Sequence, residues 1–350
     1  MLTILAVLLI LTPLTAFVTK QPRYFQSLSM TQASASFKSA TSTVIFDIDG
    51  TLADSFELGF SATQNVLPAD VSITHEDYHA HTIYPTPERL ARHYYQMPIP
   101  NGEISDGPSL AMELGLVASK DEFMETGTRL GREFDELYIG LVNTETARFY
   151  DGISDMLLRL STGVPPEEAT TASNARPVNL GALTNAAVEY AEAVLQVNGV
   201  RSLFTCCHGA DDVPRPKPHP DGLFVCVSNI FGSENILANA KSCVYVGDSP
   251  SDGRAAAAAG MKSIGVAYGS HALHSISPCF DEIVHTPQEL EASLWRLLLI
   301  EDPAAMTAFD GLSCSAFKLE QLQCGQQAKR IQNFLASNEG ESPSSEKIGP

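Results

Sequence analysis

The chain has 350 residues, of which 44% are apolar, and it carries a formal net charge of -19. This length and apolar content allow a large buried core, so we expect a soluble globular protein with one large or two small domains. Such an acidic surface excludes nucleic acid and anionic lipid as partners, because both would be repelled. A small anionic metabolite remains compatible with it where local cations, backbone N–H groups or a metal ion meet the anion.

The first 42 residues have the composition of a targeting segment. The run 2–16 is almost entirely apolar, is interrupted by Pro13 and is too short to span a bilayer. We therefore interpret residues 1–16 as a signal peptide and expect no stable membrane insertion. Residues 17–42 begin with Phe17, are rich in Ser and Thr and contain no acid, as a transit peptide does. The tandem resembles the bipartite presequence of algae with complex plastids, and it implies a plastid protein. An ordinary secretory signal with a spacer, giving a secreted or endomembrane protein, is the alternative.

Short apolar runs that end in Gly, Asp or Asn predict buried parallel strands. They lie at 44–46, 178–183, 202–206, 243–246 and 263–266. Helical spacing between these runs predicts helices at 186–197, 222–230 and 254–259. Alternating strands and helices predict an α/β fold with a doubly wound parallel sheet, built from residues 43–55 and 149–300.

One interval breaks this alternation. Residues 56–148 show helical spacing without a convincing strand, so we predict a helical cap domain inserted after the first strand. Residues 161–177 form a Pro, Thr and Ala loop that we expect at the surface. We expect residues 301–350 to be a partly disordered extension with a helix at 316–335.

The seven cysteines make an odd count without a C-x-x-C pair, which argues against a disulfide scaffold. Cys206, Cys207 and His208 are adjacent, but successive strand residues point to opposite faces and these three cannot all meet one ion. We expect buried structural thiols.

The strongest motif is V-I-F-D-I-D-G-T-L-A-D-S at 44–55, in which a buried strand delivers Asp47 and Asp49. Ligands of open α/β sheets bind at the carboxyl ends of the strands. Two carboxylates followed by Gly50, which lets the backbone approach a ligand, suit a divalent metal and an anion. A calcium loop is the rival interpretation, but Thr51 and Leu52 do not supply its further ligands.

Three further strand ends complete a charge-balanced site. G-A-L-T-N at 181–185 provides the Thr184 hydroxyl and the Asn185 amide for phosphate oxygens. K-P-H-P-D-G at 217–222 holds Lys217 in a turn stiffened by prolines. V-Y-V-G-D-S-P-S-D at 244–252 ends another buried strand in Asp248, with Asp252 four residues later.

Taken in order, the four motifs resemble those of the haloacid dehalogenase superfamily, over about residues 43–290. The resemblance implies that Asp47 attacks phosphorus and becomes an aspartyl phosphate, and that Asp49 protonates the leaving oxygen and later deprotonates water. It implies that Mg²⁺ is the cofactor. The implied metal ligands are Asp47, the backbone carbonyl of Asp49, Asp248 and, more as a support of this set, Asp252; the implied phosphate-binding groups are Thr184, Asn185, Lys217 and the backbone near Gly50.

Some of these residues have structural alternatives. Thr184 and Asn185 alone would suit a helix N-cap, Lys217 a solvated turn, and Asp252 a helix-capping carboxylate without metal contact. A catalytically silent scaffold protein of the same fold would be expected to lack Asp47 or Asp49, and both are present.

The substrate inferred from the resemblance is a small phosphate monoester. Asp49 favours esters over halides, because dehalogenation needs no proton donor there. The segments K-P-H-P-D-G-L and V-G-D-S-P-S-D-G-R are similar to those of phosphoglycolate phosphatases, which makes 2-phosphoglycolate the preferred substrate. Residues 82–87, T-I-Y-P-T-P, depart from the Gly-containing turn expected in the cap of a phosphoglycolate phosphatase. A phosphatase acting on a sugar phosphate therefore remains an alternative.

Two rivals share the fold. A β-phosphoglucomutase-like hexose-phosphate mutase would return the phosphoryl group to a sugar. A phosphonate-cleaving enzyme would need a cap lysine, and Lys120 is the only one between 56 and 148. The cap residues that could recognise a substrate carboxylate are Arg89, Arg92, His93, Arg129 and Arg132. The sequence leaves the oligomeric state unknown.

Overall fold

The computed structural model describes residues 43–99, 105–166 and 176–298. The predicted presequence, the middle of the predicted 161–177 loop and the predicted C-terminal extension lie outside the described residues. Within the described ranges, no helix is long and apolar enough to cross a membrane.

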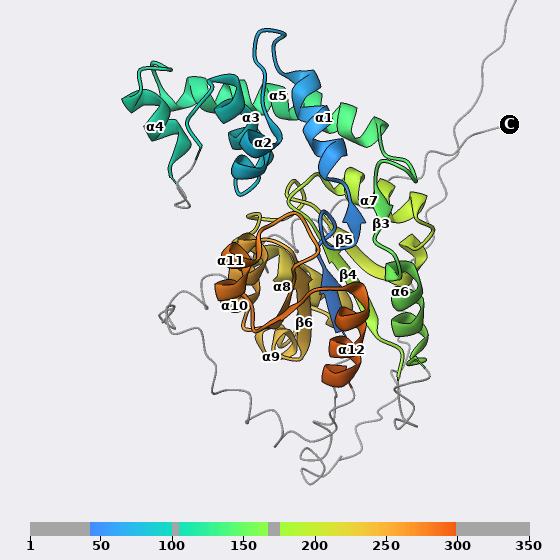
Figure 1. The fold of residues 1–350 in the computed structure, drawn as a ribbon. Helices are drawn as coiled ribbons and strands as arrows, with labels where there is room; N and C mark the ends of the chain where they lie inside the picture. Colours follow the sequence, from blue (N-terminus) through green and yellow to red (C-terminus); the bar gives the residue numbers. More distant parts are fainter. Residues whose placement is uncertain (1–42, 100–104, 167–175, 299–350) are drawn as a thin grey trace, which may run out of the picture. The chain divides into compact units, whose positions relative to one another are not determined.

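A six-stranded parallel sheet forms the centre of the fold, in the order β5-β4-β1-β6-β7-β8 (Figure 1). The strands are β1 (Thr43–Phe46), β4 (Asn179–Leu183), β5 (Phe204–His208), β6 (Cys243–Gly247), β7 (Lys262–Val266) and β8 (Glu282–Val284). From β1 the chain first adds β4 and β5 on one side and then β6 to β8 on the other. The direction of winding therefore changes at β1, and ligands of such sheets bind at this point.

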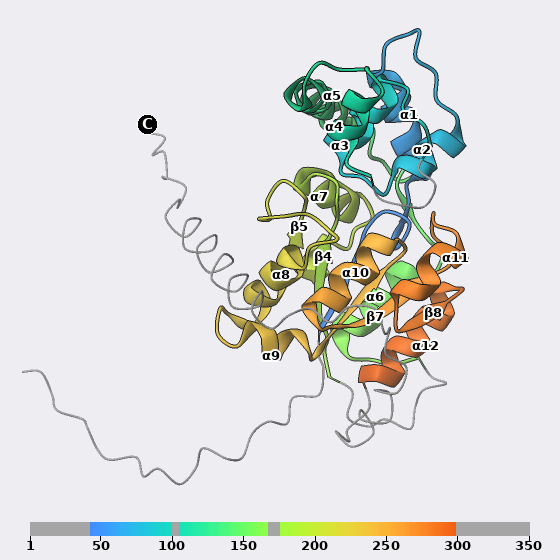
Figure 2. The same ribbon diagram turned by 90° about the vertical axis from the view of Figure 1, so that its left-hand side faces the viewer.

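Helices cover both faces of the sheet, which is why its strands are continuous apolar runs. The helices are α6 (Ile153–Thr162), α7 (Val188–Val197), α8 (Asp221–Phe231), α9 (Ile236–Ala240), α10 (Pro250–Ala259), α11 (Leu273–Ile276) and α12 (Pro287–Leu298). Val44 and Phe46 of β1 pack with α6, α7 and α12 in one core cluster. Ile45, which points the other way, packs with α8, α9 and α10 in a second cluster. Figure 2 shows α8 and α9 on one side of the sheet and α6 and α12 on the other.

The predicted strands and helices are confirmed with small shifts in their bounds. β5 begins at Phe204, because Arg201–Leu203 forms a 3₁₀ turn, and it ends at His208. The strand therefore lies two residues later in the chain than predicted. Helix α10 begins at Pro250, four residues before the predicted start, because Ser249 and Asp252 form a capping box there. The short strand β8 was not predicted, since three residues carry little periodicity.

The insertion after β1 is helical, as predicted. Its helices are α1 (Phe56–Val66), α2 (His75–His81), α3 (Thr86–Tyr94), α4 (Gly107–Glu113) and α5 (Lys120–Gly140). A small antiparallel pair, β2 (Ala53–Asp54) and β3 (Arg148–Phe149), joins the chain where it leaves and re-enters the sheet domain. This pair was not predicted, and it brings the two connections of the insertion side by side.

Candidate active site

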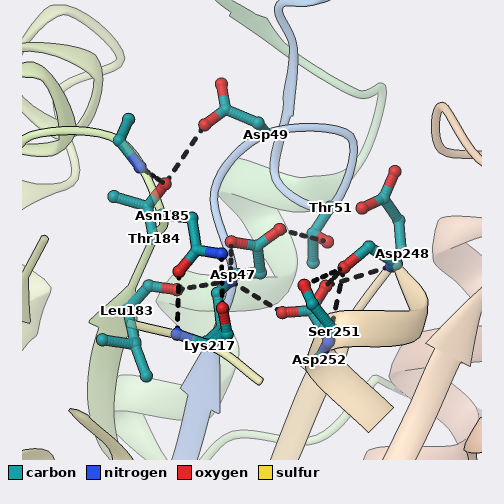
Figure 3. Close-up of polar contacts among 12 residues, drawn as sticks. Asp47, Asp49, Thr51, Leu183, Thr184, Asn185, Lys217, Asp248, Ser251 and Asp252 are labelled. Carbon is teal, nitrogen blue, oxygen red and sulfur yellow. Dashed lines mark hydrogen bonds and ion pairs between the residues drawn. The ribbon is translucent and has the colours of Figure 1, made fainter. Parts of the chain in front are cut away.

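The four predicted motifs meet at the carboxyl end of the sheet (Figure 3). β1, β4 and β6 are neighbours in the sheet, so the residues that follow them lie close together. Asp47 follows β1, Thr184 follows β4 and Asp248 follows β6. The fold thus places side chains that are up to 201 positions apart at one site.

Lys217 is the cation at the centre of the site and is only 4% exposed. Its ammonium donates to Asp47 Oδ1 at 2.6 Å and to Asp252 Oδ1 at 2.7 Å. It also lies 3.1 Å from the Tyr245 hydroxyl and 3.2 Å from the carbonyl oxygen of Leu183. Burial lowers the pKa of Lys217, but the two carboxylates outweigh this effect and raise it, so the side chain stays charged. The solvated-turn alternative is therefore wrong.

Asn185 holds the backbone of Lys217. Its Nδ2 donates to the Lys217 carbonyl at 3.0 Å, and its Oδ1 accepts from the Lys217 N–H at 3.0 Å. These contacts give Asn185 a role in positioning Lys217. Its phosphate-binding role stays a prediction, because Nδ2 carries a second N–H. Thr184 is not the N-cap of α7, which is Ala187; its hydroxyl donates to Asp49 Oδ2 at 3.2 Å.

Gly50 occupies a position at which any other residue would be strained. Its φ is +74°, and a Cβ there would lie 2.1 Å from Asp248 Oδ2. The Asp248 carboxylate is also held by the Ser270 N–H at 2.7 Å, and His271 Nδ1 lies 3.4 Å away. The absence of a side chain at Gly50 therefore lets the first motif approach the fourth.

Asp252 is buried and occupied at both oxygens. Oδ1 accepts from Lys217 and from the Tyr245 hydroxyl, the latter at 2.8 Å, and Oδ2 accepts from the N–H and hydroxyl of Ser249. Burial alone would raise the pKa of Asp252, but Lys217 lowers it overall. These contacts favour a supporting role over direct metal ligation. The helix-capping alternative is confirmed in part, because Asp252 both caps α10 and orients Lys217.

Asp49 points toward the helical insertion. Its Oδ1 accepts hydrogen bonds from Ser55 at 2.5 Å, Tyr190 at 2.6 Å and Tyr138 at 3.1 Å. Tyr138 belongs to α5 of the insertion and Tyr190 to α7 of the sheet domain, and their rings stack with centroids 4.0 Å apart. The second carboxylate is therefore fixed by both parts of the fold. The sequence offered no signal for these tyrosines, because their convergence depends on tertiary packing.

The carboxylates fit a divalent cation. Oxygens of Asp47, Asp248 and Asp252 lie within 4.8 Å of one another, and all three side chains are buried. Burial, together with the charges of Asp252 and Asp248, raises the pKa of Asp47 well above its usual value, and Lys217 only partly offsets this. The single positive charge of Lys217 does not balance the negative charges of the three carboxylates, so a bound cation would stabilise them. Mg²⁺ prefers oxygen ligands of this kind. Asp47 and Asp248, together with the carbonyl of Asp49, would hold it.

A pocket of about 120 Å³ opens between these residues and the insertion. Asp47, Asp49, Thr184 and Lys217 line one side, and Arg89 of α3 is among the residues lining the other. Arg89 is 8% exposed and packs over the rings of Tyr78 and Phe134. Its Nη1 donates to the Tyr78 hydroxyl at 3.2 Å, whereas its buried Nε has no hydrogen-bond partner among the described residues.

The other predicted cap cations lie outside this pocket. Arg92 is fully buried and paired with Glu88 at 2.8 Å, while Arg129 and Arg132 line a separate hollow. Burial lowers the pKa of His93 to about 3, so this histidine is neutral and its interpretation as a cation is wrong.

Comparisons with known proteins identify the family of the chain. Residues 44–266 match the model of the family described as haloacid dehalogenase-like hydrolase. Among curated proteins, the phosphoglycolate phosphatase of Shigella dysenteriae serotype 1 is 27% identical over 239 residues, which cover 65% of this chain and 81% of that protein. The phosphoglycolate phosphatase of Escherichia coli K12 is 26% identical over 239 residues, with the same coverage of 65% and 81%.

Solved structures share the fold. A predicted phosphoglycolate phosphatase from Haemophilus somnus 129pt aligns with a TM-score of 0.52 at 21% identity, over 74% of this chain and 98% of that one. CbbY from Rhodobacter sphaeroides, in complex with phosphate, aligns with a TM-score of 0.51 at 18% identity, over 71% and 96%. The chain therefore belongs to the haloacid dehalogenase-like hydrolases and is an enzyme of that family, similar to phosphoglycolate phosphatases.

Proposed function

We propose that the protein is a Mg²⁺-dependent phosphatase that hydrolyses a small phosphate monoester, with 2-phosphoglycolate as the substrate. The observation that carries the phosphatase proposal is the state of Asp47. Its Oδ1 is held by Lys217, while Oδ2 receives only a long contact of 3.4 Å from Thr51. A carboxylate that is clamped at one oxygen and lines a pocket with the other is placed to attack phosphorus.

The side chains divide the reaction as follows. An oxygen of Asp47 forms a bond to phosphorus while the bond from phosphorus to the leaving oxygen breaks, and Asp49 gives that oxygen its proton. Asp49 then takes a proton from water, whose oxygen attacks the aspartyl phosphate and releases inorganic phosphate with Asp47 regenerated. Lys217 and the Thr184 hydroxyl stabilise the charge on the phosphoryl oxygens. Bound Mg²⁺ would supply further positive charge beside Asp47 and Asp248.

Arg89 supports a substrate that carries a carboxylate. The guanidinium lies in the pocket wall, where its described side-chain hydrogen bond goes to the neutral Tyr78 hydroxyl, so its charge can meet a substrate anion. Arginine binds a carboxylate through two parallel hydrogen bonds, a geometry that the planar group favours. The curated relatives named phosphoglycolate phosphatase point to the same class of substrate.

The first experiment measures phosphate release by the chain from residue 43 onward, with and without Mg²⁺. The substrates are phosphoglycolate, hexose phosphates, nucleotides and pyrophosphate. We expect phosphoglycolate to be the preferred substrate, and Asp47→Asn to reduce its turnover by at least about 10³-fold, because the amide cannot form the covalent intermediate. Turnover that survives in Asp47→Asn would contradict the mechanism. Conversion of a hexose phosphate without phosphate release would favour the mutase.

A second experiment separates substrate choice from chemistry. Arg89→Met should raise the KM for phosphoglycolate about 10- to 100-fold, as the loss of a charged hydrogen bond predicts. An ester whose leaving group lacks a carboxylate, such as p-nitrophenyl phosphate, should be affected little. The matched control is Arg129→Met, since Arg129 is exposed and pairs with Glu133 outside the pocket. Equal losses on both esters would rule out recognition of the carboxylate by Arg89.

We also propose a plastid location, supported only by the composition of residues 1–42. A fluorescent protein fused after residue 42 tests this proposal. Fluorescence in plastids is expected, and fluorescence in the secretory pathway would support the alternative.

A further inference from the structure

A second cluster of ligand-type side chains lies away from the carboxylates. It consists of Cys206 and His208 on β5 and Cys226 on α8, and one ligand atom of each lies within 4.8 Å of the others. Cys206 and Cys226 are buried and His208 is half-buried. None of the three lines the active-site pocket.

The strand geometry explains this convergence. Residues two apart on a strand point to the same face, so Cys206 and His208 both face α8. Cys206 packs in the core cluster that contains Cys226, whereas Cys207 packs in the cluster on the opposite face of the sheet. The expectation that three adjacent residues cannot meet one ion is confirmed. What the sequence did not reveal is that Cys226 from a helix completes a set with two of them.

The spacing suits a thiophilic cation. Zinc binds sulfur at about 2.3 Å and imidazole nitrogen at about 2.0 Å, so two sulfurs on one tetrahedral ion lie about 3.8 Å apart. The ligand atoms lie within 4.8 Å of one another, so no pair would need to close by more than about 1.3 Å. Two thiolates and one imidazole are ligands that such a cation prefers over Mg²⁺.

His208 is also oriented as a metal ligand would be. Its Nδ1 lies 2.8 Å from Asp212 Oδ2, and Asp212 Oδ1 accepts from the Gly209 N–H at 2.8 Å. A carboxylate that accepts a hydrogen bond from Nδ1–H favours the neutral tautomer in which Nε2 is unprotonated, and this arrangement is common behind metal-binding histidines. Nε2 now contacts Asn229 Nδ2 at 2.7 Å, an amide that a cation would replace.

We propose that Cys206, His208 and Cys226 form a binding site for a zinc-type divalent cation, independent of the carboxylate site. The segment 209–220 connects β5 to α8 and carries Lys217. A cation bound by β5 and α8 would join the two ends of this segment. Its expected effect is to stabilise the loop that supplies the catalytic ammonium.

The test measures bound zinc per chain after dialysis against micromolar Zn²⁺ in excess Mg²⁺, which occupies the carboxylate site. We expect about one Zn²⁺ per chain. Co²⁺ in place of Zn²⁺ should give a thiolate charge-transfer band in the near ultraviolet, a readout that does not depend on phosphatase activity. Bound zinc without this band would place the ion at other ligands and would overturn the proposal.

The variants separate the ligands from general folding effects. Cys206→Ser and His208→Gln should each weaken Zn²⁺ binding by at least about 100-fold, and Asp212→Asn by about 10- to 100-fold. The matched control is Cys207→Ser, which removes a buried thiol from the same strand but from the opposite face and should bind Zn²⁺ as the unaltered chain does. His208→Gln and Asp212→Asn alter partly exposed positions, so they remain informative if Cys206→Ser does not fold. Absence of tight Zn²⁺ binding in the unaltered chain, or equal loss in Cys207→Ser, would overturn the proposal.

Discussion

Asp49 shows how a single side chain connects the insertion to the chemistry. Its carboxylate accepts from Tyr138 of α5, from Tyr190 of α7 and from Ser55, which precedes α1. In the proposed reaction Asp49 is the proton donor and acceptor, and it must be held in one orientation to act on both the leaving oxygen and the attacking water. The hydroxyl groups provide this orientation, so movement of α5 would be transmitted directly to Asp49.

Tyr190→Phe tests this positioning role. The substitution removes the 2.6 Å hydrogen bond to the Asp49 carboxylate and keeps the stacked ring. We expect kcat to fall about 10-fold with little change in KM, because a hydrogen bond to a charged group contributes about 1.5–3 kcal/mol.

The control for this prediction is Tyr95→Phe. It removes a hydroxyl that pairs with Thr126 at 3.0 Å within the insertion, outside the pocket. Steady-state kinetics of both variants on one substrate show whether the loss of kcat is specific to the Tyr190 hydroxyl. An unchanged kcat in Tyr190→Phe, or an equal loss in Tyr95→Phe, would argue against positioning.

At the scale of elements, the insertion depends on a close approach of α3 to α5. Gly127 of α5 lies against Pro87 of α3, and a Cβ there would be 2.1 Å from the Pro87 carbonyl oxygen. Such a contact cannot be accommodated without moving the backbone. Since α3 carries Arg89, this helix pair also places the cation in the pocket wall.

Gly127→Ala should therefore lower the free energy of unfolding by about 1–3 kcal/mol and raise the KM of a carboxylate-bearing substrate. The matched control is Gly140→Ala at the end of the same helix, where a Cβ would have open space. Alanine at position 140 should leave the free energy of unfolding unchanged or raise it by up to about 1 kcal/mol. Urea unfolding of the two variants provides the comparison, and equal stabilities would refute the packing argument.

At the scale of the whole molecule, buried neutral groups make stability depend on pH. His93 is 3% exposed, and burial lowers its pKa to about 3, with the neighbouring His81 and Arg89 adding to this shift. An unfolded histidine has a pKa of about 6.5. Between these two values the unfolded chain binds a proton that the folded chain does not, so this contribution to stability is complete above about pH 6.5 and falls as the pH drops toward 3.

His93→Gln should remove this dependence. From pH 7 to pH 5.5, we expect the unaltered chain to lose about 1 kcal/mol more stability than the variant does. Urea unfolding at the two pH values measures the difference. His285→Gln, at an exposed position, serves as the control and should retain the full dependence. A His93→Gln variant with an unchanged loss would show that His93 is not buried in its neutral form.

Much of the architecture could be predicted because parallel strands that are covered on both faces must be apolar throughout. β1, β4, β6 and β7 therefore stood out, and the first three are each followed by a motif of the candidate site. β8 and the pair formed by β2 and β3 escaped prediction, since two or three residues have no measurable period.

The sequence by itself determined the fold class. It also identified Asp47, Asp49, Lys217 and Asp248 as candidate-site residues, because ligands of a doubly wound sheet bind at its carboxyl edge. Only the tertiary structure decided how the remaining side chains act. It turned Asn185 toward the Lys217 backbone, placed Arg89 rather than Arg92 in the pocket wall, and brought Cys226 to Cys206 and His208. The physical reason is that periodicity reports which face a residue occupies within its own element, whereas contacts between elements depend on how those faces are packed together.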